Sequence, residues 1–110
     1  MANNVPLIVF PVKDLEKAKK FYNTYLGTQP YVDGEYYVGY KLDDQEVGLD
    51  PNGKTIVSYI EIDDIQASLQ TLLEVGAVVI MEPKDVGAGM MVAQVEIEGN
   101  VMGLRQVSKQ

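Results

Sequence analysis

An internal repeat constrains the fold of this 110-residue chain more than any other feature of its sequence. The segment 7–15 is an apolar run that passes into an acidic residue, and the segment 57–65 repeats this plan about fifty residues later. A single register aligns Asp14 with Asp64 and the apolar residues on either side of them. Self-similarity at a fixed spacing predicts two copies of one structural unit.

Each copy is expected to begin with a strand and to continue as a helix. Asp14 and Asp64 stand where a side-chain oxygen can accept hydrogen bonds from the free amides of a first helical turn. Apolar side chains then recur at steps of three and four residues, which places them on one face of a helix. Gly27 and Gly76 end the two helical segments, because glycine readily adopts the left-handed conformation that closes a helix.

Short β-prone runs separated by turn residues follow each predicted helix. They cover residues 29–33, 36–42 and 47–50 in the first copy, and residues 77–81, 90–96 and 101–106 in the second. Each half is therefore predicted to be β-α-β-β-β, with module one at residues 5–50 and module two at residues 55–107. We expect one α+β domain over residues 1–110, since no low-complexity run or long linker divides the chain.

Composition narrows the classes of function. The chain has no cysteine, which excludes disulfides and thiolate chemistry and favours a reducing cytoplasm. Its net charge of -7 disfavours nucleic acid and anionic membrane as partners. No apolar run approaches the ~20 residues that span a bilayer, and residues 1–4 do not resemble a secretory signal. The lysines at positions 13, 17, 19 and 20 are interpreted as a solvated helix face.

The segment 11–22, with the pattern Val-x-Asp-Leu-x-x-Ala-x-x-Phe-Tyr, followed by Leu26 and Gly27, resembles the opening of the vicinal oxygen chelate superfamily. That superfamily includes glyoxalase I, bleomycin-resistance proteins and extradiol dioxygenases. The segment 59–65 resembles the start of its second module, and the segment 99–104 resembles its closing hairpin. The resemblance spans nearly the whole chain and implies two curved sheets that form a cup, in a glyoxalase/bleomycin-resistance-like fold.

Members of this superfamily hold a divalent metal in the cup with four side chains. The resemblance aligns those four ligand positions with Leu7, Gly48, Val57 and Gly103. None of these residues offers a donor atom, and the chain contains no histidine. A catalytic divalent ion needs three or four imidazole or carboxylate ligands at roughly 2.0 to 2.2 Å. We therefore predict no metal and no other cofactor; carboxylates at Asp50 and Glu61 would make at best a weak calcium- or magnesium-type site.

Strand alternation predicts which side chains line the cup. In module one, the 41–47 hairpin puts Tyr37, Gly39, Lys41, Glu46, Gly48 and Asp50 on one face, whether its loop has two or four residues. The opposite face, with Tyr36, Val38, Tyr40, Val47 and Leu49, is the more apolar one and is expected to pack on the helix. The inward set of strand 90–96 stays open between Met91, Ala93, Val95 and Met90, Val92, Gln94. The predicted ligand contacts are Leu7, Val9, Tyr37, Gly48, Asp50, Val57, Tyr59, Glu61, Met91, Gly103 and Arg105.

Each of these assignments has a structural alternative. Tyr37 and Tyr59 could be ordinary sheet residues, Arg105 could simply pair with Asp50 or Glu61, and the methionines could be core filler. The hypothesis we favour is a metal-free protein, similar to bleomycin-resistance-type members, that binds an aromatic or planar small molecule. The alternatives are a lyase, isomerase or dioxygenase with relocated carboxylates or metal-independent chemistry, and a partner-binding module with a vestigial cup. The resemblance also implies a homodimer.

Overall fold

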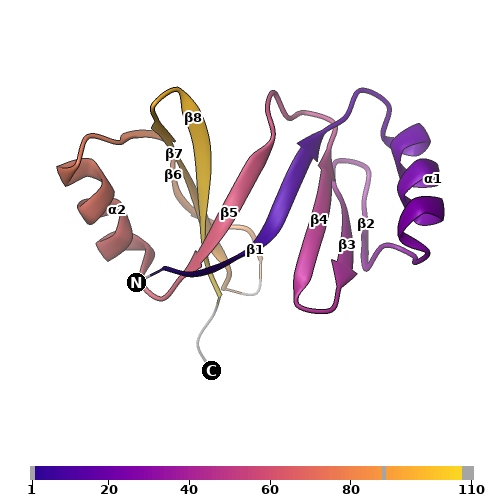
Figure 1. The fold of residues 1–110 in the computed structure, drawn as a ribbon, viewed down its shortest axis with the longest axis horizontal. Helices are drawn as coiled ribbons and strands as arrows, with labels where there is room; N and C mark the ends of the chain where they lie inside the picture. Colours follow the sequence, from indigo (N-terminus) through magenta and orange to yellow (C-terminus); the bar gives the residue numbers. More distant parts are fainter. Residues whose placement is uncertain (1, 88, 108–110) are drawn as a thin grey trace. The chain divides into compact units, whose positions relative to one another are not determined.

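The computed structural model describes residues 2–87 and 89–107. Each half has the predicted order β-α-β-β-β (Figure 1). The first half consists of β1 (Ala2–Pro11), α1 (Leu15–Leu26), β2 (Val32–Asp33), β3 (Val38–Leu42) and β4 (Gln45–Asp50). The second half consists of β5 (Val57–Ile62), α2 (Ile65–Glu74), β6 (Val78–Asp85), β7 (Met91–Ile97) and β8 (Asn100–Gln106).

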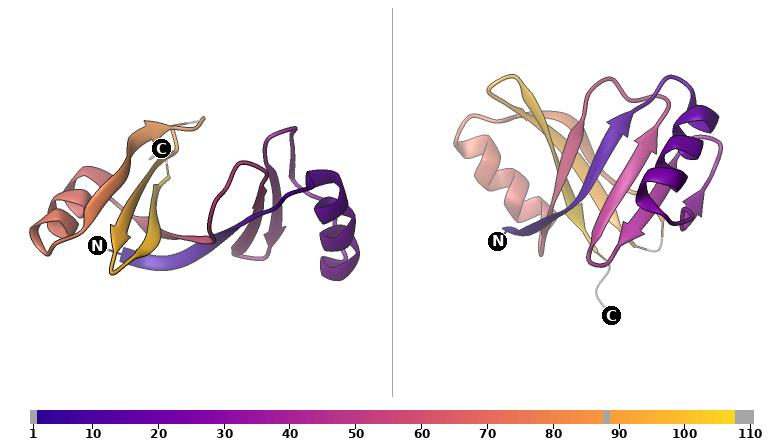
Figure 2. Two further views of the ribbon diagram at one scale, coloured as in Figure 1. Left: turned by 90° about the horizontal axis from the view of Figure 1, so that it is seen from above. Right: turned by 45° about the vertical axis from the view of Figure 1, so that its right-hand side comes forward.

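The chain divides into two compact units, which are described separately below. The N-terminal unit comprises residues 6–57, and the C-terminal unit comprises residues 58–107 together with residues 2–5. In both views of Figure 2, α1 runs alongside strands of the N-terminal unit and α2 alongside strands of the C-terminal unit. The cup implied by the resemblance remains a prediction.

The two sheets have the same strand order. In the N-terminal sheet, β4 pairs in parallel with β1 and antiparallel with β3, which also pairs with β2. In the C-terminal sheet, β8 pairs in parallel with β5 and antiparallel with β7, which also pairs with β6. One row across the first sheet contains Val9, Gly48, Gly39 and Val32, and the corresponding row of the second contains Tyr59, Gly103, Gln94 and Met81. The repeat in the sequence is thus a repeat in topology.

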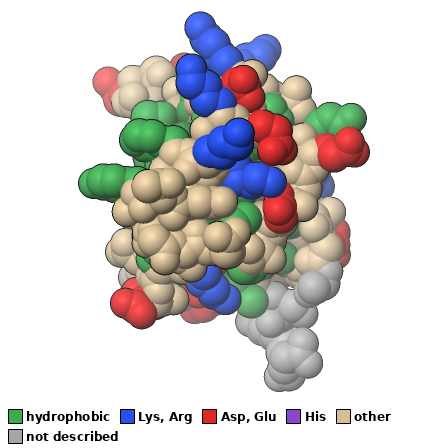
Figure 3. All heavy atoms as spheres, turned by 90° about the vertical axis from the view of Figure 1, so that its right-hand side faces the viewer, with side chains coloured by type: hydrophobic (Ala, Val, Ile, Leu, Met, Phe, Trp, Pro, Cys, Tyr) green, Lys and Arg blue, Asp and Glu red, His purple; other side chains and the backbone are tan. Residues whose placement is uncertain are grey.

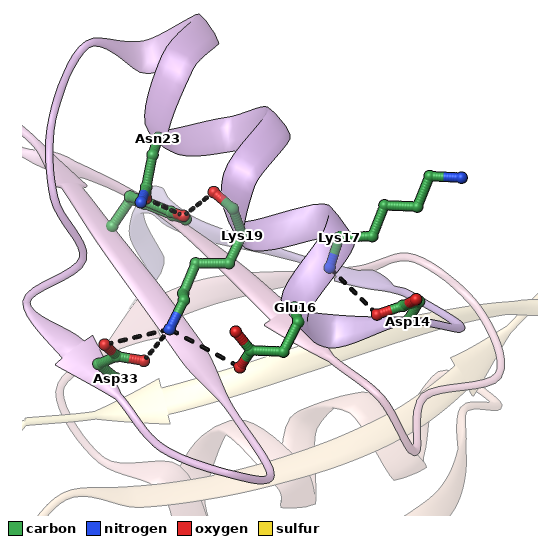
Figure 4. Close-up of polar contacts among 7 residues, drawn as sticks. Asp14, Glu16, Lys17, Lys19, Asn23 and Asp33 are labelled. Carbon is green, nitrogen blue, oxygen red and sulfur yellow. Dashed lines mark hydrogen bonds and ion pairs between the residues drawn. The ribbon is translucent and has the colours of Figure 1, made fainter.

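Both helices start as predicted. Asp14 Oδ1 accepts a hydrogen bond from the Lys17 amide at 3.1 Å (Figure 4), and Asp64 Oδ1 accepts one from the Ala67 amide at 3.1 Å. Gly27, with φ 69°, ends α1 in the left-handed conformation. The second helix ends at Glu74, and its closing glycine at position 76 also has a positive φ.

Each unit has its own apolar core between helix and sheet. The N-terminal core contains Val38, Tyr40 and Leu49, against which aromatic residues of β1 and α1 pack. This confirms the predicted helix-facing set, apart from Tyr36. That residue is 73% exposed, because it precedes β3 in a turn closed by the Gly34 amide and the Tyr37 carbonyl at 2.9 Å. The C-terminal core is aliphatic; its buried members are Ile62, Ile65, Leu69, Ala77, Ala93, Val95 and Leu104.

Two strand predictions differ from the structure. The strand expected at residues 29–33 is reduced to Val32–Asp33, since Pro30 has no amide hydrogen to donate to a ladder. The strand expected at residues 77–81 instead extends to Asp85 and includes Pro83. It can do so because β6 is the outer strand of its sheet, and its pairing with β7 shifts register twice, between Val79 and Met81 and again before Lys84.

A polar link holds α1 to β2 in the N-terminal unit. Lys19 Nζ lies 3.0 Å from Asp33 Oδ1 and 3.8 Å from Glu16 Oε2 (Figure 4). The hydrogen bond to Asp33 raises the pKa of Lys19. The hydroxyl of Tyr40 lies 2.6 Å from Asn23 Oδ1, and burial raises the pKa of Tyr40. No helix in the described ranges is long and apolar enough to cross a membrane.

Candidate functional site

The central glycine of the N-terminal sheet is covered by a tyrosine. A Cβ atom added at Gly48 would lie 2.1 Å from Tyr37 Oη and 2.7 Å from Tyr37 Cζ. These distances are below 3.0 Å, which real Cβ atoms essentially never show. The same ring rests on Gly39, where an added Cβ would lie 3.2 Å from Tyr37 Cε2. Glycine at position 48 thus leaves the space that the phenol of Tyr37 occupies.

The central glycine of the C-terminal sheet is covered in the same way by a different residue. Tyr59 lies directly opposite Gly103 in the β5–β8 register. A Cβ atom added at Gly103 would lie 2.3 Å from Tyr59 Cδ2 and 2.5 Å from Tyr59 Cε2. The Tyr59 hydroxyl accepts a hydrogen bond from Gln94 Nε2 at 2.9 Å, so the ring spans the row from β5 across β8 to β7.

A charged pair lies two residues further along the same two strands, β5 and β8. Arg105 and Glu61 are opposite each other in the register, and Arg105 Nη2 lies 3.2 Å from Glu61 Oε1. Arg105 is 6% exposed. The predicted alternative, in which Arg105 pairs with Glu61, is therefore what the structure shows. The guanidinium can be buried because it is paired with Glu61, whereas an unpaired charge in this position would be strongly destabilising.

Tyr31, which sequence reasoning missed, shares the sheet face with Tyr37. Its hydroxyl donates a hydrogen bond to Glu46 Oε1, and Lys41 Nζ lies 5.3 Å from the centre of its ring. Its Cε1 atom would lie 3.3 Å from a Cβ at Gly39. The sequence signal for Tyr31 was the pair of glycines at positions 39 and 48. Their lack of side chains leaves room for two aromatic rings on this face, whereas only Tyr37 was predicted there.

The register of β7 settles the face that the sequence left open. Val92 lies opposite Arg105 and Gln94 lies opposite Gly103, so these two share the face of Tyr59. Met91 instead packs against the apolar core on the helix side. This corrects the assignment of Met91 as a ligand contact.

The remaining predicted contacts are distributed as follows. Leu7 and Val9 lie opposite Glu46 and Gly48, and are 8% and 9% exposed. Val57, the first residue of β5, is 8% exposed. Asp50 is half-buried, and its Oδ1 accepts a hydrogen bond from the Asn52 amide at 2.8 Å.

No family model matches the chain, and no curated protein matches it either. Solved structures do match. A hypothetical protein from Bacillus halodurans has a TM-score of 0.80 at 16% identity, covering 97% of this chain and 96% of that one. A methylmalonyl-CoA epimerase variant from Streptomyces coelicolor, in complex with 2-nitronate-propionyl-CoA, has a TM-score of 0.80 at 16% identity, covering 98% and 96%. A glyoxalase/bleomycin resistance protein/dioxygenase superfamily member from Vibrio splendidus has a TM-score of 0.73 at 19% identity, covering 96% and 98%.

The chain has the glyoxalase/bleomycin-resistance fold. This confirms the fold that the sequence predicted. Sequence identities of 16% to 19% support a shared fold and do not support a shared chemistry.

The residues that the resemblance aligns with metal ligands do not fit a metal ion. Leu7 and Val57 are aliphatic, and the volume beside each of Gly48 and Gly103 is taken by a tyrosine ring. A histidine at either glycine would therefore have to displace that ring before it could reach an ion. Within residues 2–87 and 89–107, no three Asp, Glu, His or Cys side chains are grouped so that they could hold a metal.

Proposed function

We propose that the protein is a metal-free small-molecule-binding protein, and that its ligand is aromatic or planar and lies against a tyrosine-bearing sheet face. The observation that carries this proposal is the placement of Tyr37 over Gly48 and of Tyr59 over Gly103. Each tyrosine has one side of its ring supported by sheet backbone, and each is only partly buried. A flat ring held in this way is a ready surface for stacking.

The size of the expected interaction is modest. An aromatic pair contributes roughly 0.5 to 1.5 kcal/mol beyond the area it buries. Micromolar affinity corresponds to about 8 kcal/mol, so most of the binding free energy would come from burial of apolar ligand surface.

Polar groups on the C-terminal face would orient such a ligand. The Tyr59 hydroxyl and the Gln94 amide form one hydrogen-bonded unit, and the Glu61–Arg105 pair lies one step further along the strands. The net charge of -7 favours ligands that carry a positive charge. The absence of cysteine supports a reducing, cytoplasmic location.

An enzyme of the same superfamily is the competing proposal, since one structural neighbour is an epimerase. Metal-independent chemistry would rely on Glu61 as a general base with help from Tyr59. The ion pair with Arg105 argues against this role, because proton abstraction by Glu61 would leave Arg105 buried beside a neutral acid.

A thermal-shift screen of aromatic metabolites and antibiotics tests the proposal. A ligand at about 100 times its Kd stabilises the folded state by about 2.7 kcal/mol. For each hit, titration calorimetry on Tyr37→Ala and Tyr59→Ala should show roughly tenfold or greater weakening. Tyr36→Ala is the matched control, because Tyr36 is adjacent in sequence but 73% exposed in a turn. Unchanged affinity in both test variants would reject these faces as the binding site.

A further inference from the structure

An apolar groove lies on the helix side of the C-terminal sheet, between α2 and the strands β5 and β8. Its volume is about 310 Å³. Eight residues line it, among them Ile60, Ser68, Thr71, Leu72 and Met102. The tyrosine-bearing face of the sheet is on the other side, since Tyr59 and Gly103 alternate with Ile60 and Met102 along β5 and β8. The groove is therefore distinct from the proposed ligand site.

The N-terminal unit shows what fits such a groove. Phe10, Phe21 and Tyr22 stand where the C-terminal unit has Ile60, Thr71 and Leu72, counted from the two capping aspartates. The rings of Phe10 and Tyr22 are stacked with centroids 6.3 Å apart, and Phe21 meets Tyr22 edge-on at 5.4 Å. The rings of Phe10 and Tyr22, which pack against the N-terminal core, thus stand at the positions of the smaller Ile60 and Leu72 that line the groove.

The aromatic surface that matches the groove is exposed on α1. Phe21 is 63% exposed and Tyr25 is 77% exposed. Their rings are stacked 6.1 Å apart with 13° between their planes. Contiguous exposed apolar surface of this kind can serve as an interaction site. The face that α1 presents carries hydrophobic side chains together with both basic and acidic ones (Figure 3).

The charges beside the two surfaces differ in balance, since α1 carries three lysines and one glutamate, whereas α2 carries one glutamate and no basic residue. Lys13, Lys17 and Lys20 are exposed on or next to α1, close in sequence to the aromatic pair. The corresponding positions around α2 are Asp63, Ala67 and Gln70, and α2 itself contains neither lysine nor arginine. Glu74, one turn after Thr71, adds a further negative charge near the groove.

We propose that the protein self-associates through these two surfaces, with the Phe21–Tyr25 pair of one copy seated in the α2 groove of a second copy. The lysines of α1 then face the acidic residues around α2, which fixes the orientation of the contact. This contact joins two different surfaces, unlike a symmetric pairing of like surfaces. It brings α1 of one copy against α2 of the other.

Two variants of the full-length protein remove one surface each. Phe21→Ser combined with Tyr25→Ser removes the aromatic pair, and Thr71→Lys places a positive charge in the groove opposite the partner's lysines. All three positions are exposed, so the fold should be retained, which circular dichroism and thermal melting would verify. Tyr36→Ser and Gln66→Lys are the matched controls, because both are exposed and neither lies on the two surfaces.

Sedimentation velocity measures association from about 1 µM to about 500 µM. The wild-type protein and both controls should associate, and each test variant should show a rise in Kd of roughly tenfold or more. Mixing the two test variants should restore association, because one supplies an intact groove and the other an intact aromatic pair. A monomeric wild-type protein over this range would overturn the proposal. Association that neither variant weakens, or that mixing does not restore, would overturn it as well.

Discussion

In the N-terminal unit, Gly48 of β4 is covered by the ring of Tyr37, which directly precedes β3. In the C-terminal unit, Gly103 of β8 is covered by the ring of Tyr59 from β5. The two tyrosines do not correspond to each other in the repeat. Val9 occupies the place of Tyr59, and Val92 occupies the place of Tyr37. A tyrosine inherited from one ancestral copy does not explain this arrangement. What the two units share is a covered glycine, and each achieves it with a different residue.

The surroundings of the two rings differ in a way that bears on function. Tyr37 shares its face with Tyr31, which bonds to Glu46 and lies beneath Lys41. Tyr59 is instead held by an amide, and its neighbouring pair is ionic. The N-terminal face is therefore the more aromatic of the two, and the C-terminal face has the more specific hydrogen-bonding groups.

The apolar cores of the two units differ as well. Alanine substitution of an equivalent core residue in each unit should give the largest effect on stability. Tyr40 and Val95 occupy equivalent core positions, each in the strand next to the central one, and both are 0% exposed. Tyr40→Ala should lower the free energy of unfolding by about 3 to 5 kcal/mol, and Val95→Ala by less, because the cavity is smaller. Urea denaturation measures both. Equal losses would contradict the view that the N-terminal core depends on its aromatic residue.

Substituting alanine for Gly48 or Gly103 should lower the free energy of unfolding by a smaller amount. The two substitutions compare directly how tightly each tyrosine ring covers its glycine. At Gly48 the clash is with the hydroxyl end of Tyr37, which can swing away, whereas at Gly103 it involves Cγ and Cδ2 of Tyr59, close to the backbone. Gly103→Ala should therefore cost about 1 to 3 kcal/mol and Gly48→Ala less. Combining Gly103→Ala with Tyr59→Ala should cost less than the sum of the two single changes. Strict additivity in denaturation experiments would show that the ring does not occupy this space.

Metal removal should have no effect in either unit. Because the four metal positions lack donors and two are covered by rings, the protein purified without chelator should contain no stoichiometric zinc, nickel, iron or manganese. Its melting temperature should be the same with and without EDTA. Elemental analysis and a thermal melt check this, and a ratio of metal to protein near one that chelation reverses would refute it.

Much of this architecture was predictable from the sequence because it depends on local rules. The capping aspartates fixed both helix starts, and alternation placed Val38, Tyr40 and Leu49 on the helix side. The face of β7 was not predictable, because it depends on the turn before β8. That turn pairs Ile97 with Asn100 and so contains two residues, both with positive φ.

The rings above the glycines were only partly predictable. Parity correctly placed Tyr37 and Tyr59 on the faces of Gly48 and Gly103, but it carries no information on how far a side chain reaches along a row. Tyr31 was missed because it precedes a two-residue strand whose position is set by pairing with β3. The groove beside α2 depends on the packing of a whole helix against a sheet, which apolar periodicity alone does not describe.

The irregular pairing of β6 has a consequence for how the protein behaves at high concentration. An outer strand with exposed valine and isoleucine, as at positions 78 and 80, would ordinarily template the addition of a strand from another molecule. Here the two register shifts bend the ladder, and Pro83 has no amide hydrogen to offer an incoming strand. These features make the edge a poor template for the strand stacking that leads to amyloid.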